Sequence, residues 1–112
     1  MVKHVAPAHH AVEMEDLEAL RDLLDRGVDV NEEYQGLTLL HHAIDVEIDG
    51  HTQSGGPLHV DVTAYLLARG ADPRRRSGGE SGISAEHLAL TRGHWLATCL
   101  IEEWIRTHPD GA

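Results

Sequence analysis

The chain has 112 residues, 41% of them hydrophobic, and a formal net charge of −10. This length predicts one modest domain, and the acidic surplus argues against direct binding to nucleic acid, whose phosphates require a basic face. Aromatic residues make up 4% and phenylalanine is absent, so the core must consist of Leu, Val, Ile and Ala. Such a core favours small, closely packed helices.

The sequence argues against a secreted or membrane protein and against a protein held together by disulfides or by cysteine-bound metal. The N-terminus has no apolar run resembling a signal peptide, and no stretch is long enough to cross a bilayer. Cys99 is the single cysteine, which excludes an intramolecular disulfide and a paired-cysteine metal site. These features predict a cytoplasmic protein that does not associate with membranes and carries no cofactor.

The first predicted unit, residues 3–35, consists of two helices. Its first helix carries the phrase His9-His10-Ala11-Val12, and its second ends at Leu23-Leu24-Asp25-Arg26-Gly27, where the glycine suits a left-handed helix end. Between Glu13 and Glu33 stand nine carboxylates and two arginines. This acidic segment is interpreted either as the solvated face of a soluble end cap or as a docking surface for a basic partner.

The second predicted unit, residues 36–79, repeats these phrases and adds an insertion. The first phrase returns as His41-His42-Ala43-Ile44, and Thr38 is placed to cap its helix. Residues 46–57 separate the two helices and are predicted to form a loop, either an inert spacer or a recognition loop. The start of the insertion resembles a calcium loop, but Gly56 stands where a bidentate Glu is needed, so calcium is not predicted.

The third predicted unit, residues 80–112, begins with Ser84 as the helix cap and carries His87-Leu88-Ala89-Leu90. Its last helix is expected to cap the stack, with a predicted apolar side made of Leu96, Cys99, Leu100, Ile101 and Trp104. Cys99 is therefore interpreted as a small core residue rather than a nucleophile. The serines lie in glycine-rich turns without a nucleophile elbow, and an enzyme is not predicted.

Units repeated at this period form stacks, and several spaced motifs resemble those of ankyrin repeats. Thr38-Leu39-Leu40-His41 is similar to the family's Thr-Pro-Leu-His phrase, and Leu66-Leu67-Ala68-Arg69-Gly70-Ala71-Asp72 is similar to its second-helix ending. Gly93-His94 matches the pair that opens the second helix. The resemblance implies an all-α ankyrin-repeat solenoid of about three helix-turn-helix units with short hairpin-like turns, in a single domain over residues 1–112.

The recurring histidines receive a structural role from this resemblance. In the family, this residue fastens the helix start to the adjoining turn, so we expect His9, His41 and His87 to act with the caps Thr38 and Ser84. His10 and His42 would lie on adjacent helices, whose axes are about 8–10 Å apart. That spacing is long for two ligands of one zinc, and a third ligand is not evident, so no metal site is predicted.

The resemblance also implies that the turn tips and the first helices form a concave binding side. Tyr34 is the strongest single candidate for a contact, with a tyrosine folded onto the neighbouring tip as the equal alternative. The complete set of predicted partner-binding residues is Glu32, Glu33, Tyr34, His42, Asp45, Glu47, Arg74, Arg75, Arg76 and Arg92.

The predicted function is that of a protein–protein interaction module that uses these tips, the concave helices and the insertion. An acidic inhibitor suits a basic toxin or nuclease, and small acidic ankyrin proteins resemble bacterial immunity proteins; eight arginines against one lysine fit a bacterial source. The alternatives are a structural or self-associating scaffold module and, third, a histidine-based metal-binding protein. A monomer is expected rather than a homodimer.

Overall fold

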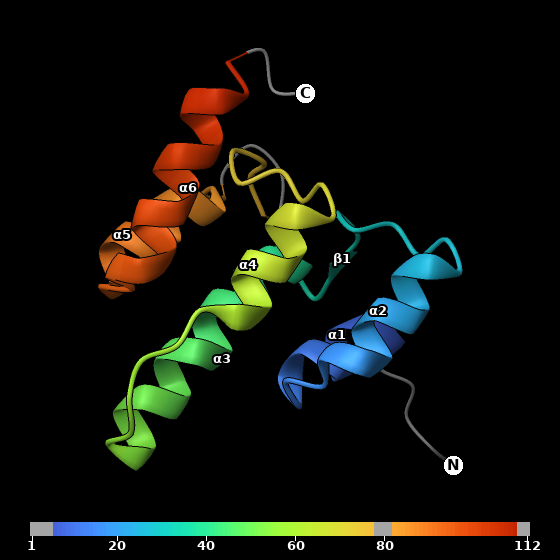
Figure 1. Ribbon diagram of the computed structural model, residues 1–112, viewed down its shortest axis with the longest axis horizontal. Coiled ribbons are helices and arrows are strands. Elements are labelled where there is room, and N and C mark those ends of the chain that lie inside the picture. The colour runs from blue at the N-terminus through green and yellow to red at the C-terminus, as the bar shows by residue number, and fades with distance from the viewer. Residues whose placement is uncertain (1–5, 78–81, 110–112) are drawn as a thin grey trace.

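The computed structural model describes residues 6–77 and 82–109, and these residues form three pairs of helices in chain order (Figure 1). The start of unit one and the boundary between units two and three at residues 79 and 80 lie outside this range. The helices are α1 (Pro7–Glu13), α2 (Leu17–Asp25), α3 (Leu39–Ser54), α4 (Asp61–Ala68), α5 (Ala85–Arg92) and α6 (Trp95–Thr107). The predicted all-α fold is confirmed.

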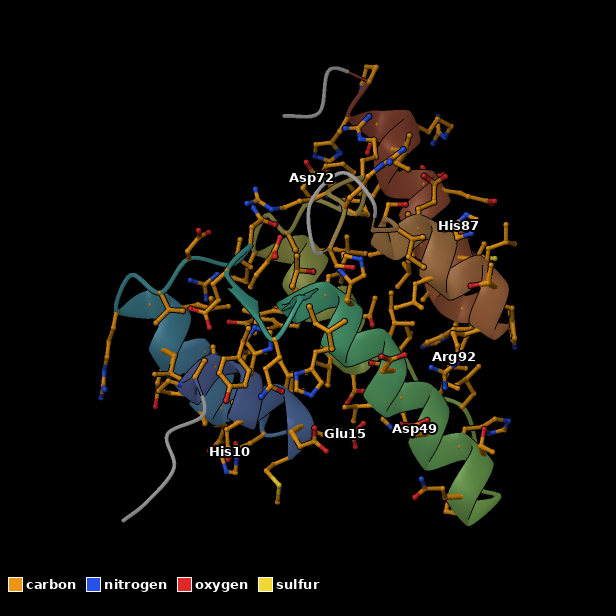
Figure 2. All side chains as sticks on the ribbon, turned by 180° about the vertical axis from the view of Figure 1, so that it is seen from behind. His10, Glu15, Asp49, Asp72, His87 and Arg92 are labelled. Carbon is orange, nitrogen blue, oxygen red and sulfur yellow. The ribbon has the colours of Figure 1, made fainter. Side chains whose placement is uncertain are left out.

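The pairs stack so that the first helices form one layer and the second helices another. α1 contacts α2 and α3, α3 contacts α4 and α5, and α6 contacts α5 and α4. The layer of α2, α4 and α6 faces the viewer in Figure 1, and the layer of α1, α3 and α5 faces the viewer in Figure 2. Ala11, Ala43 and Ala89 recur at equivalent positions of the first helices and are all buried, which allows close contact between neighbours.

Local hydrogen bonds explain where the first helices begin. The Thr38 hydroxyl accepts the backbone N–H of His41, and the Ser84 hydroxyl accepts that of His87, as predicted. α1 has Ala6 at its N-cap and therefore no side-chain cap. Pro7 occupies the first helical turn, where the N–H group that proline lacks would have no partner within the helix. Units two and three thus begin alike, and unit one begins differently.

A short hairpin lies between units one and two. β1 (Glu33–Tyr34) pairs antiparallel with β2 (Leu37–Thr38), with Glu33 opposite Thr38 and Tyr34 opposite Leu37. The two turn residues, Gln35 and Gly36, both have positive φ, as a tight hairpin turn requires. Arg76 forms an isolated antiparallel bridge with Ser84 at the corresponding place before α5.

The prediction that residues 46–57 form a loop is wrong for most of the insertion. α3 continues to Ser54 and ends at Gly55, whose φ of 71° is the left-handed conformation typical of a helix end. The helix continues because Ile44 and Ile48 extend its buried stripe, so each added turn still has an apolar contact. The far end of α3 consequently reaches beyond the neighbouring helices (Figure 1).

The predicted buried side of the last helix is correct only in part. Ile101 is fully buried and Trp104 packs against the core, as predicted, whereas Cys99 and Leu100 are exposed and Ala97 is buried instead. The helix is apolar around much of its circumference, so its composition did not identify the side that faces α4 and α5. No helix within residues 6–77 and 82–109 has both the length and the apolar character needed to cross a bilayer.

Candidate functional site

The exposed side of α1, α3 and α5 forms a continuous surface, here called the inner face (Figure 2). The predicted residues His42, Asp45 and Arg92 all lie on it, together with Glu13 and Asp49, which the sequence analysis did not select. Asp49 follows Asp45 by one helical turn, and Glu13 follows His9 by one turn. The i, i+4 spacing along α1 and α3 was the signal that could have found them.

Arg92 links α5 to α3 across the inner face. Its Nη1 lies 2.5 Å from Oδ1 of Asp45 and its Nη2 lies 3.1 Å from Oδ1 of Asp49. In Figure 2, Asp49 and Arg92 lie close together on their two helices. Burial raises the pKa of Asp45, and the nearby guanidinium of Arg92 opposes that rise. Three exposed or half-exposed side chains are therefore held in place between two units.

His42 links α3 to α1 in a similar way. Its Nε2 lies 2.7 Å from Oε1 of Glu13, and its Nδ1 lies 3.1 Å from Nδ1 of His9. Beside it, a hollow of about 210 Å³ is lined by residues of α1, the hairpin and α3: His9, His10, Glu13, Tyr34, Gln35, Leu37 and His42. The predicted contacts Tyr34 and His42 therefore border the same hollow.

The first tip combines one half-buried ring with two different carboxylates. Tyr34 is half-buried, with its ring centroid 5.7 Å from that of His9. Glu33 is exposed. Glu32 is half-buried, and its Oε2 is buried without a hydrogen-bond partner among the residues that the structure describes. Burial, followed by the charge of Asp29, raises the pKa of Glu32.

The three predicted arginines of the second tip differ in their surroundings. Arg74 donates from Nη2 to the backbone oxygen of His108 at 3.0 Å, and its guanidinium lies 5.4 Å from the centroid of Trp104. Arg74 is half-exposed, and these two contacts attach its side chain to the C-terminal end of α6. Arg75 and Arg76 are exposed.

The prediction that Glu47 contacts a partner is wrong, because its side chain is completely buried. Its Oε2 accepts the backbone N–H groups of Val62 and Thr63, and its Oε1 accepts the Thr63 hydroxyl and Nε2 of His94. α4 has no capping side chain of its own, so this carboxylate caps it from α3. Sequence spacing could not reveal that the extended α3 turns this residue inward.

Two of the recurring histidines fasten a turn to a helix start, in agreement with their predicted structural role. Nε2 of His9 lies 3.4 Å from the backbone oxygen of Glu32, and Nε2 of His41 lies 2.7 Å from that of Ile83. The His87 side chain is exposed and makes no such contact among the described residues. Its backbone N–H still bonds the Ser84 hydroxyl.

One group within the described residues has the composition of a metal site: Glu47, His59 and Asp61. Both oxygens of Glu47 already accept two hydrogen bonds each, as described above. Nδ1 of His59 bonds Oδ1 of Asp61 at 2.7 Å, and Nε2 lies 3.6 Å from Oε2 of Glu15. The hydrogen bond to Asp61 raises the pKa of His59. These contacts account for the cluster as a set of polar links around the start of α4.

Comparison with protein families agrees with the geometry. A model described as ankyrin repeats (many copies) matches residues 8–52, and one described as ankyrin repeat matches residues 35–77. The search of curated proteins gave no match. Ankyrin repeats are in general protein–protein interaction modules and are typically non-catalytic. The two overlapping matches, the stacked helix pairs and their capped starts together show that this chain belongs to the ankyrin-repeat family.

Proposed function

We propose that this protein binds a basic partner protein through its inner face and the first hairpin tip. The observation that carries the proposal is the excess of carboxylates there: Glu13, Asp45 and Asp49 on the helices and Glu33 at the tip outnumber the guanidinium of Arg92, which pairs with Asp45 and Asp49. With a net charge of −10 for the whole chain, the surface attracts a positively charged partner over several ångströms before contact.

Several of the side chains on this surface are already held before a partner arrives. Arg92 positions the carboxylates of Asp45 and Asp49, and His42 positions that of Glu13. Side chains that are ordered in the free protein lose less conformational entropy on binding. The hollow beside Tyr34 offers a place for one side chain of the partner, next to an aromatic ring of the kind that often contributes strongly at interfaces.

The biological role we propose is inhibition of the partner in trans, as an immunity protein does for a bacterial toxin. A basic toxin that cleaves nucleic acid must carry a positive surface for its own substrate. An acidic face would cover that surface and compete with the phosphates.

Capture experiments with the labelled full chain test the proposed surface. We expect a captured basic protein whose association rate constant falls as salt concentration rises, because steering between opposite charges is screened. Glu33→Lys and Tyr34→Ala should each weaken capture. Glu18→Lys is the matched control, since Glu18 is an exposed carboxylate on α2 in the opposite layer.

Two results would contradict the proposal. Equal loss of capture in the Glu18→Lys control would show that only the net charge matters and not this face. A stable dimer of the chain at micromolar concentration in sedimentation, with no other partner captured, would favour the self-associating scaffold instead.

A further inference from the structure

Unit one lacks a hydroxyl that unit two uses. In unit two, the Thr38 hydroxyl lies 2.6 Å from Nδ1 of His41 and fixes that ring. Ala6 stands at the equivalent position of unit one, so His9 has no such partner within its own unit. Nδ1 of His42 takes this place at 3.1 Å, and the two imidazole rings are stacked with centroids 5.3 Å apart.

The number of protons on these two rings follows from their partners. The Glu32 backbone oxygen only accepts, so Nε2 of His9 must carry a hydrogen. The ionised Glu13 carboxylate also only accepts, so Nε2 of His42 must carry one as well. The two facing Nδ1 atoms need a third hydrogen between them. Two neutral imidazoles supply only two, so the complete set of bonds requires one imidazolium.

The surroundings locate this positive charge on His42. His9 is buried, and burial, followed by the charge of His42, lowers the pKa of His9. His42 faces the carboxylate of Glu13 from α1 and lies near Asp45 on its own helix. The other groups at the pair are the Tyr34 ring from β1, the exposed His10 and the half-buried Glu32.

We propose that Glu13, His42 and His9 form a clasp between units one and two that is complete only when His42 is an imidazolium cation. Loss of that proton leaves two acceptors facing each other at one of three contacts: Glu13 with His42 at 2.7 Å, His42 with His9 at 3.1 Å, or His9 with the Glu32 backbone oxygen at 3.4 Å. A fourth proton instead places two N–H donors opposite each other. The clasp is therefore closed in an intermediate pH range and opens on both sides of it, whether or not a partner is bound.

Nitrogen NMR of the histidine rings in the full chain tests this assignment directly. At pH 7.0 we expect both ring nitrogens of His42 to be protonated, while Nδ1 of His9 is an unprotonated acceptor. In Glu13→Gln, His42 should become a neutral ring at the same pH. Ala6→Ser supplies a hydroxyl to Nδ1 of His9 and should also release the proton from His42. His10→Gln is the control, because the His10 side chain is exposed, and it should change neither ring.

Amide hydrogen exchange supplies a second measurement of the same clasp. Exchange in α1 should become about two- to fivefold faster in Glu13→Gln at pH 7.0, which is the effect of losing a partly exposed ion pair. The variant should exchange like the wild type above the pH at which His42 loses its proton. Two neutral rings at pH 7.0 in the wild type, or the cation on His9, would overturn the proposal.

Discussion

Glu47 joins α3 to α4 within unit two and, through His94, joins unit two to unit three. Its buried carboxylate accepts four hydrogen bonds, at 2.7–3.1 Å, from α4 and from His94, the N-cap residue of α6. Nδ1 of His94 accepts the Ala97 N–H, so its Nε2 carries the hydrogen that bonds Glu47. A buried carboxylate is tolerated when each of its oxygens accepts hydrogen bonds. A substitution that removes one of these donors or acceptors leaves a buried polar group unpaired and lowers the free energy of unfolding.

Glu47→Gln should destabilise the protein by about 3 kcal/mol, because its amide group would face donors instead of accepting from them. Urea unfolding at pH 7 measures this loss. The matched control is Asp49→Asn on the same helix, which weakens an exposed bond to Arg92 and should cost less than about 1 kcal/mol. Similar losses in both variants would mean that the four bonds do not act as described.

The fastening histidines predict loss of stability in acid. Burial lowers the pKa of His41 below 6.5, which outweighs the raising effects of the Ile83 carbonyl, Asp45 and Glu33. The unfolded chain therefore takes up this proton at higher pH than the folded chain. The contribution is fully present above pH about 6.5 and is lost as the pH falls through the folded pKa, at about 1.4 kcal/mol per unit of lowering.

Urea unfolding at pH 7.5 and pH 5.0 checks this pH dependence. The wild type should lose stability between the two values, and His41→Gln should lose less between them from its lower starting point. His10→Gln should keep the wild-type difference, since His10 is exposed. A His41→Gln variant with an unchanged difference would refute the assignment to this ring.

At the scale of single residues, the sequence predicted what depends on near neighbours in the chain. The Thr38 and Ser84 caps were found because each bonds a residue three positions later. The role of Glu47 was not found, because its partners lie 15 to 47 positions away and their placement requires the packed stack. The prediction that Cys99 is a core residue was wrong for the same reason, since the packing of the neighbouring helices decides which side of α6 is buried.

At the scale of elements, α3 has 16 residues against 7 in α1 and 8 in α5. The two glycines near its end have opposite roles. Gly50 lies within the helix with open space around its Cα, whereas Gly55 ends it with a φ of 71°. Glycine weakens a helix interior but is favoured in the left-handed conformation.

Gly50→Ala should therefore stabilise the protein by about 0.5–1 kcal/mol, and Gly55→Ala should destabilise it by about 1 kcal/mol. The two substitutions add the same methyl group five residues apart, so each serves as the control for the other. Thermal unfolding of both variants measures the pair. Effects of the same sign would contradict the described helix end.

The existence and order of the helices were predictable, since the repeated phrases mark each start and each end. The length of α3 was not predicted, because glycine and serine near residues 50–56 resemble a loop. The spacing of Ile44 and Ile48 was the better signal, as it continues the buried stripe for one more turn. Their contacts outweigh the low helix propensity of Gly50.

At the scale of the whole molecule, the central unit has neighbours on both sides and the end units have one each. In a stack of this kind, stability comes from the units and from the contacts between neighbours. Hydrogen exchange should therefore be slowest in α3 and α4 and faster in α1, α2, α5 and α6. Slowest exchange in an end unit would show that its own packing, rather than its neighbour, dominates.

The last residues of α3 extend past the buried stripe of the helix. Ile48 is buried and Glu47 anchors α4, while residues 49–55 are exposed. The connection from Gly55 to α4 therefore starts at a point away from the rest of the stack. Changes in its length would be absorbed outside the packed layers, so this end of unit two is suited to accept foreign segments, such as a peptide tag, while the three units keep their contacts.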